Sequence, residues 1–147
     1  MAFTTPCFIQ LQNSVDVWSV IDKLNKLGYK PSINQYGLQA GSESTYIICK
    51  SDGLYYFAYS ISYYTNDWGI NCIDNKELFL ALAALRDDTN ENQWFILDVE
   101  AYTNIHAGDW FIATDMNGGK HIGAQIEPTY CYKATVQEII EHFNKNK

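Results

Sequence analysis

Residues 45–59 read TYIICKSDGLYYFAY, and this stretch decides the fold because it contains two strands and the turn between them. Residues 45–50 and 54–59 are rich in β-branched and aromatic side chains, which favour extended structure. The three residues SDG separate these runs, and Gly53 stands where such a turn needs a positive φ. The stretch therefore predicts an antiparallel hairpin.

The second strand of this hairpin has two different faces. Alternation along an extended chain places Tyr55, Phe57, Tyr59, Ile61 and Tyr63 on one side. These residues are large and mainly apolar, whereas the opposite side is mostly small or polar. We expect the first set to face the core, as in a strand with one buried and one wet face.

Several aromatic residues of this region are candidates for an exposed binding patch. They are Tyr56, Tyr63, Tyr64 and Trp68, and the TNDWG turn places Trp68 on a loop. Tyrosine and tryptophan are enriched at protein interfaces, and they also stack on single-stranded bases. A register slip of one residue would exchange the two faces of the strand.

Three helices begin at recognisable capping residues. The first starts at Asn13 or Ser14 and stops at Gly28. It carries Val17, Ile21 and Leu24 on one face, with Trp18 beside them. This pattern is typical of an amphipathic helix that lies on a sheet.

The other two helices show capping boxes, in which a cap residue precedes a glutamate by three positions. Asp74 pairs with Glu77, and Thr135 pairs with Glu138. The middle helix should end in the polar stretch 87–90. Its sequence ELFLALAALR is apolar nearly all round, which indicates a helix central in the domain or covered by a second subunit. The last helix is amphipathic, with its apolar face formed by Val136, Ile139, Ile140 and Phe143, and with His142 on the wet face.

Further strands complete the chain. They are expected at CFIQL (7–11), INCI (70–73), QWFIL (93–97), DWFIAT (109–114) and YCYK (130–133). The elements predict a single domain, 1–147, of the α+β class: two layers, with a mainly antiparallel sheet and three helices. A helix–hairpin–strand order that occurs twice is consistent with an internal duplication.

Composition excludes several kinds of function. The 147 residues carry a net charge of −7, with ten basic residues scattered along the chain, which does not fit a protein that binds duplex nucleic acid or anionic membranes. No apolar run is long enough to span a bilayer, and the N-terminus does not resemble a signal peptide. We expect a cytoplasmic protein whose four cysteines, Cys7, Cys49, Cys72 and Cys131, are reduced thiols.

Catalytic signatures are sparse. His106 stands three residues before Asp109, a spacing that permits a metal site or a His–Asp pair but matches no helical ligand motif. No phosphate-binding loop and no nucleophile motif occurs in the sequence. We therefore expect neither a catalytic residue nor a cofactor.

Three stretches resemble segments of a known group of proteins. MAFTTPCFIQL, NKELFLALAALRD…NQWFI and KATVQEIIEHFNK are similar to segments of small uncharacterised proteins encoded by crAss-like gut phages, and they cover about a third of the chain. The shared motifs are strands, caps and helix faces. The resemblance implies a phage protein made in a bacterial host, and it transfers no catalytic residue.

The sequence thus predicts a non-enzymatic module that contacts a host or phage protein, or a second copy of itself. One alternative is a single-stranded nucleic-acid-binding protein that uses an aromatic sheet face, with Lys23, Lys26, Lys30 and Lys50 as its basic residues. Another is an enzyme or metal-binding protein built around His106 and Asp109.

Overall fold

The computed structural model describes residues 3–32, 45–58, 69–89, 92–98, 107–112 and 131–144. Within these ranges the chain forms three helices and eight strands in the order β1 (Cys7–Leu11), α1 (Ser14–Leu27), β2 (Lys30–Pro31), β3 (Thr45–Cys49), β4 (Leu54–Ala58), β5 (Ile70–Asn71), α2 (Lys76–Ala83), β6 (Trp94–Leu97), β7 (Trp110–Ile112), β8 (Cys131–Lys133) and α3 (Val136–Asn144). No helix in these ranges has the length and apolar character needed to cross a membrane.

The hairpin predicted from residues 45–59 is the centre of the first sheet. Strands β3 and β4 pair antiparallel, with Ile47 opposite Phe57, and Gly53 in the turn has φ 83°. The sheet order is β2-β4-β3-β1-β5. Strand β1 pairs antiparallel with β3, whereas the short edge strands β2 and β5 run parallel to their neighbours.

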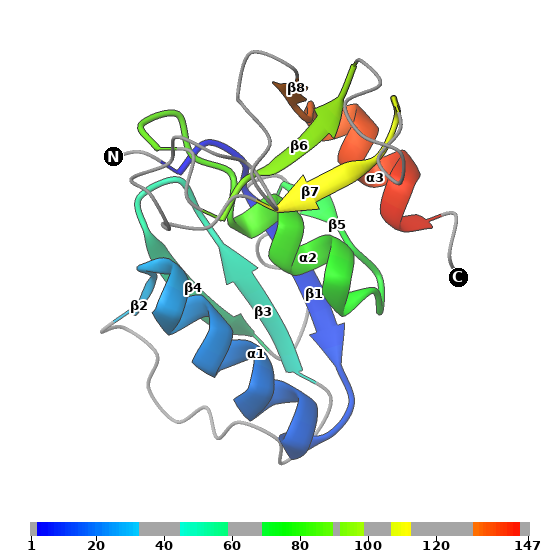
Figure 1. Ribbon diagram of the computed structural model, residues 1–147. Coiled ribbons are helices and arrows are strands. Elements are labelled where there is room, and N and C mark those ends of the chain that lie inside the picture. The colour runs from blue at the N-terminus through cyan, green and yellow to red at the C-terminus, as the bar shows by residue number, and fades with distance from the viewer. Residues whose placement is uncertain are drawn as a thin grey trace.

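A second, smaller sheet has the order β7-β6-β8 and is antiparallel throughout. Figure 1 shows α1 and α2 over one face of the first sheet and α3 beside the second sheet. Two mainly antiparallel sheets with three helices confirm the α+β class. The internal duplication stays a prediction.

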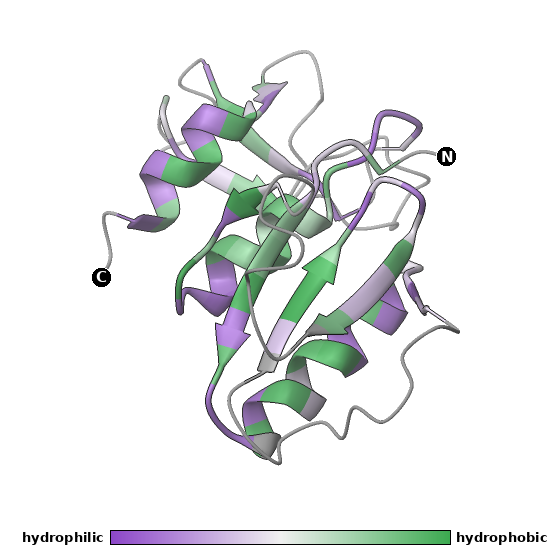
Figure 2. Ribbon diagram, turned by 180° about the vertical axis from the view of Figure 1, so that it is seen from behind, coloured by the Kyte–Doolittle hydropathy of each residue, from purple (hydrophilic) through white to green (hydrophobic). Residues whose placement is uncertain are grey.

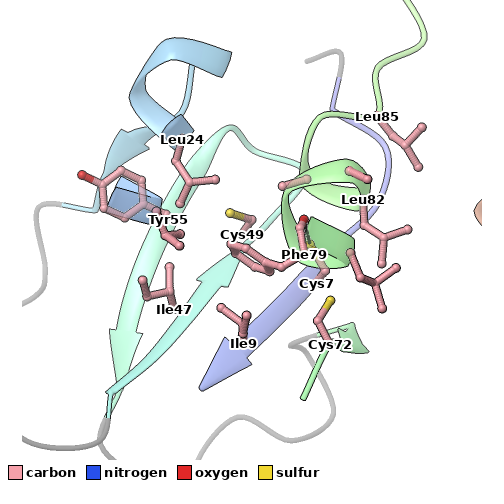
Figure 3. Packing of buried hydrophobic residues seen from close by; sticks show 14 of the residues in the cluster. Cys7, Ile9, Leu24, Ile47, Cys49, Tyr55, Cys72, Phe79, Leu82 and Leu85 are labelled. Carbon is pink, nitrogen blue, oxygen red and sulfur yellow. Dashed lines mark hydrogen bonds between the residues drawn. The ribbon is translucent and has the colours of Figure 1, made fainter. Parts of the chain in front are cut away.

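The main core lies between the first sheet and the helices α1 and α2 (Figure 3). Three cysteines contribute to it: Cys7 is the register partner of Cys49, and Cys72 follows β5. These three and Cys131 are buried free thiols. Burial raises the pKa of the Cys7 and Cys49 thiols well above the usual range, so both stay neutral at physiological pH.

Helix α1 begins and ends where the sequence predicts. The Asn13 side chain accepts a hydrogen bond from the Asp16 N–H at 2.9 Å, and Gly28 closes the helix in the left-handed conformation. The predicted face of Val17, Ile21 and Leu24 is buried, whereas 59% of Trp18, which stands beside it, is exposed. Trp18 is about 100° around the helix from Val17, which takes it away from the buried stripe.

Helix α2 differs from its prediction at both ends. Its cap is Asn75, whose Oδ1 accepts from the Leu78 N–H at 3.1 Å, so the predicted box of Asp74 with Glu77 is wrong. The helix also ends at Ala83, before the predicted stretch 87–90.

Two buried side chains from elsewhere in the chain complete this early end of α2. The Tyr29 hydroxyl donates to the Ala83 carbonyl at 2.7 Å, and Gln93 Nε2 donates to the Ala84 carbonyl at 2.6 Å. Gln93 Oε1 also accepts from the Arg86 N–H at 3.0 Å. The last carbonyls of α2 are therefore satisfied without a glycine.

Helix α3 has the predicted capping box. The Thr135 Oγ1 accepts from the Glu138 N–H at 3.2 Å, while the Glu138 carboxylate accepts from the Thr135 N–H at 3.0 Å. Its apolar face packs inward, with Ile139 and Phe143 buried.

Candidate binding groove

The site begins with the two faces of α2. One face buries Phe79 and Leu82 against the first sheet (Figure 3). The opposite face carries Leu80, Ala81 and Ala84, which lie on one stripe because they are three and four residues apart. The two alanines are small, so this stripe forms the floor of a furrow. The lack of a polar face on α2, noted in the sequence, thus has two causes: a core on one side and a groove on the other.

The groove has a volume of about 420 Å³. The described residues that line it are Lys23, Lys26, Leu27, Glu77, Leu80, Ala81, Ala84, Asn92, Trp94, Ile112 and Phe143. This volume falls within the range of roughly 300–1,000 Å³ that is typical of ligand pockets.

Two walls rise from different parts of the fold. Helix α1 provides Lys23, Lys26 and Leu27, which share one helix face. The second sheet provides the register partners Trp94 and Ile112. Figure 1 shows α2 running between these two walls.

Aromatic packing holds the second wall in place. The Trp94 ring meets the Phe143 ring edge-to-face, with ring centroids 5.5 Å apart. Trp94 is only partly buried, and 42% of Ile112 is exposed, so large apolar side chains remain accessible in the groove. Such accessible apolar surface is favoured at binding sites.

The predicted aromatic patch is described only at Tyr56, because Tyr63, Tyr64 and Trp68 lie outside the described residues, as do Tyr59 and Ile61. Tyr55 and Phe57 face the core as expected, and Tyr56 lies on the opposite face. The Tyr56 hydroxyl donates to Asp52 Oδ2 at 3.0 Å, and Lys50 Nζ lies 5.0 Å from the ring centroid. Burial, with a contribution from Asp52, raises the pKa of Tyr56.

This opposite face of the first sheet, which is turned toward the viewer in Figure 2, carries a small apolar cluster. Phe8 and Ile48 are buried there, with Tyr46 and Tyr56 packed against them. These aromatic rings are therefore part of a packed cluster, at least along the described strands.

The four lysines considered for nucleic-acid binding do not share one surface. Lys23 and Lys26 lie on α1, over the core face of the sheet, and line the groove. Lys50 lies beside Tyr56 on the other side of the sheet, and Lys30 belongs to the edge strand β2.

The structure does not test the pairing of His106 with Asp109, because His106 lies outside the described residues. Asp109 precedes β7, and its carbonyl accepts from the Leu97 N–H at 2.9 Å. Among the described side chains, no group of three or more His, Cys, Asp or Glu residues could hold a metal ion.

The expectation for His142 is wrong. This residue is half-buried and stacks on Trp110, with ring centroids 3.9 Å apart and an angle of 18° between the planes. Trp110 comes from β7, so the sequence of α3 alone gave no sign of this contact.

Reasoning from the sequence did not find the groove. The available signal was the spacing of the small residues Ala81 and Ala84 with Leu80, which places all three on one face of the helix. Comparison of the chain with protein-family models, with curated proteins and with solved structures gave no match.

Proposed function

We propose that this protein is a non-enzymatic binding module that acts by contacting another protein, with the groove over α2 as its docking surface. The observation that carries the proposal is the accessible apolar lining of the groove, formed by Leu80, Trp94 and Ile112. A well-packed aromatic and aliphatic pocket with a polar rim is the usual anatomy of an energetically important contact region.

The charged rim fits this role. Lys23, Lys26 and Glu77 stand at the edges of the apolar floor. Exposed charges around an apolar centre orient a partner and exclude wrong ones more than they add affinity. The module has a net charge of −7, so the lysines at the edge of the groove differ in sign from the protein as a whole.

The proposed setting is the cytoplasm of a bacterial host. It rests on the resemblance of the chain to proteins of crAss-like phages and on the reduced state of its buried thiols. A phage protein in this setting meets host proteins directly, and occupying the surface of a host protein is one way to redirect it.

A charge placed in the groove tests the proposal. Ile112→Glu puts a carboxylate on the apolar wall at a residue that is already 42% exposed, so the fold should tolerate it. Val15→Glu is the matched control, because Val15 is an apolar residue with 77% exposure on α1 and does not line the groove. Circular dichroism and urea unfolding would establish that both variants are folded.

Tagged wild-type protein and both variants would be used to capture proteins from nuclease-treated bacterial lysate. The captured protein would then be purified and its affinity measured by calorimetry. We expect Ile112→Glu to weaken binding at least tenfold, which corresponds to about 1.4 kcal/mol, while Val15→Glu leaves it unchanged. A purified partner that binds Ile112→Glu as tightly as wild type would contradict the proposal, and so would failure to recover any protein.

A further inference from the structure

A second hollow adjoins the groove. Its volume is about 230 Å³, and its described lining residues are Lys26, Leu27, Ala84, Arg86, Thr89 and Asn92. Four of these, Lys26, Leu27, Ala84 and Asn92, also line the groove. The two spaces are therefore neighbours, one mainly apolar and the other mainly polar.

The polar hollow is basic in an acidic protein. The chain has 17 acidic and 10 basic residues, yet the described lining of this hollow contains two cations and no carboxylate. The cations are Lys26, from the last turn of α1, and Arg86, which follows α2. Both cations are paired with carboxylates outside the lining, Lys26 with Asp22 and Arg86 with Asp88, so the hollow offers cationic hydrogen-bond donors rather than a net positive charge.

Contacts with the rest of the fold position Arg86. Its guanidinium lies over the Phe3 ring, 4.8 Å from the centroid, and its carbonyl accepts a hydrogen bond from Lys133 Nζ. Its Nε and Nη2 donate to the two carboxylate oxygens of Asp88, each at 2.9 Å. This fork-shaped contact shows the geometry in which an arginine holds a carboxylate.

The acidic partners of both cations are accessible to solvent. Lys26 Nζ lies 3.1 Å from Asp22 Oδ2, with both side chains exposed, and Asp88 is half-exposed. The exposed Lys26–Asp22 pair contributes only about 0–1 kcal/mol, so an incoming carboxylate can join or replace it at little cost. Neither Asp22 nor Asp88 lines the hollow.

We propose that the partner segment in the groove is amphipathic and acidic: its apolar side chains lie on Ala81 and Ala84, and a carboxylate enters the hollow between Lys26 and Arg86. This inference rests on the proposed function and adds the chemistry of the partner. The apolar groove supplies affinity, and the basic hollow fixes the direction in which the segment binds. Glu77, in the first turn of α2, is the acidic residue among the described residues that line the groove, so a carboxylate is disfavoured beside it.

A peptide selection tests this inference without knowledge of the natural partner. A library of random peptides displayed on phage would be selected against wild-type protein and three variants: Lys26→Glu, Lys30→Glu and Ile112→Glu. Lys26→Glu reverses the charge of the hollow. Lys30→Glu changes the net charge by the same amount on β2, where the residue lines neither space.

We expect wild-type protein and Lys30→Glu to enrich peptides that combine large apolar residues with Asp or Glu, and Lys26→Glu to lose that acidic preference. The best synthetic peptide should bind Lys26→Glu about tenfold more weakly than Lys30→Glu. Its affinity for the wild-type protein should fall by a similar factor when its Asp or Glu is replaced by Asn or Gln. Arg86→Gln should have the same effect as Lys26→Glu.

The outcomes separate this inference from the proposed function. Peptides that depend on Ile112 but show no acidic preference would overturn the inference and leave the docking groove standing. Peptides that bind Ile112→Glu as well as wild type would overturn both. If the protein forms a dimer that Ile112→Glu disrupts, the groove binds a second copy. If dodecanoate displaces every peptide at a lower concentration than the acidic peptide does, the groove binds a free fatty acid. Either result would contradict the proposed occupant.

Discussion

The side-chain amide of Asn75 joins two helices: its Nδ2 donates to the Phe143 carbonyl at 3.1 Å, while its Oδ1 accepts from the Leu78 N–H at 3.1 Å. One buried residue therefore caps the N-terminus of α2 and satisfies a carbonyl at the C-terminal end of α3.

Asn75→Ala should lower the free energy of unfolding by about 2–4 kcal/mol, because it removes an N-cap and leaves a buried carbonyl without its donor. Asn75→Ser keeps a capping oxygen and loses the contacts of Nδ2 with the Phe143 carbonyl and with Asn144 Oδ1, so it should cost about half as much. Urea unfolding would measure both values. Equal losses for the two variants would mean that the cap on α2 contributes nothing.

Gly69 permits the close approach of β5 to β1. Its φ is +81°, and a Cβ at this position would lie 2.1 Å from the Pro6 carbonyl oxygen, which accepts from the Ile70 N–H at 3.0 Å. Gly108 has a φ of +95°, and among the described residues other than its chain neighbours none has an atom within 4 Å of the corresponding Cβ position.

We expect Gly108→Ala to cost about 1–2 kcal/mol through backbone strain alone. Gly69→Ala should cost about 3 kcal/mol or more, since a clash is added to the strain. Thermal and urea unfolding of both variants would check the order, and similar stabilities would contradict the role of the Pro6 contact.

The capping box of α3 makes stability depend on pH. The Thr135 N–H is the main cause that lowers the pKa of Glu138 below its usual value of 4.5, and Tyr132 contributes by donating to Oε2 at 2.9 Å. A lowered pKa in the folded state means that the unfolded chain binds the proton more readily. The contribution is therefore complete above the unfolded pKa and is lost as the pH falls through the folded pKa.

The urea midpoint of Glu138→Gln should fall less between about pH 5 and pH 3 than the midpoint of the wild-type protein does. Glu141→Gln removes the same charge one turn away and outside the capping box, and serves as its control. An unchanged pH profile for Glu138→Gln, relative to wild type, would show that the capping box does not contribute.

The core thiols should be inert in the folded protein. Only a thiolate attacks a disulfide reagent, and burial raises the pKa of Cys7 and Cys49. With a chromogenic disulfide reagent at pH 8, we expect the four cysteines to react at the rate of unfolding and to react at once in urea. Val15→Cys, at a position with 77% exposure, should add one fast thiol. A fast phase in wild-type protein would contradict the packing of these residues.

Sequence signals located the elements whose ends are determined locally. Asn13 and Gly28 delimit α1, Thr135 and Glu138 start α3, and Gly53 makes the turn of the hairpin, because each acts on backbone within a few residues of itself. The same reasoning chose Asp74 where the cap is the adjacent Asn75, because both side chains can accept from a helix N–H.

The features that were missed depend on residues far apart in the chain. The orientation of Trp18 follows from how α1 sits on the sheet, and the burial of His142 follows from Trp110 in another element. The groove exists only because α1 and the second sheet stand on opposite sides of α2. Periodicity describes one element at a time, so it could not reveal a space lined by residues of several elements.

The end of α2 has a consequence for how the molecule opens. Tyr29 reaches it from beside the first sheet, and Gln93 from the start of the second, so separating α2 from either sheet strips a donor from a buried carbonyl. Partial unfolding therefore leaves a buried carbonyl without its hydrogen-bond donor, whether α2 first separates from the first sheet or from the second. We expect the amide hydrogens of α2 to exchange with solvent only through global unfolding, which would make the helix the slowest-exchanging part of the protein.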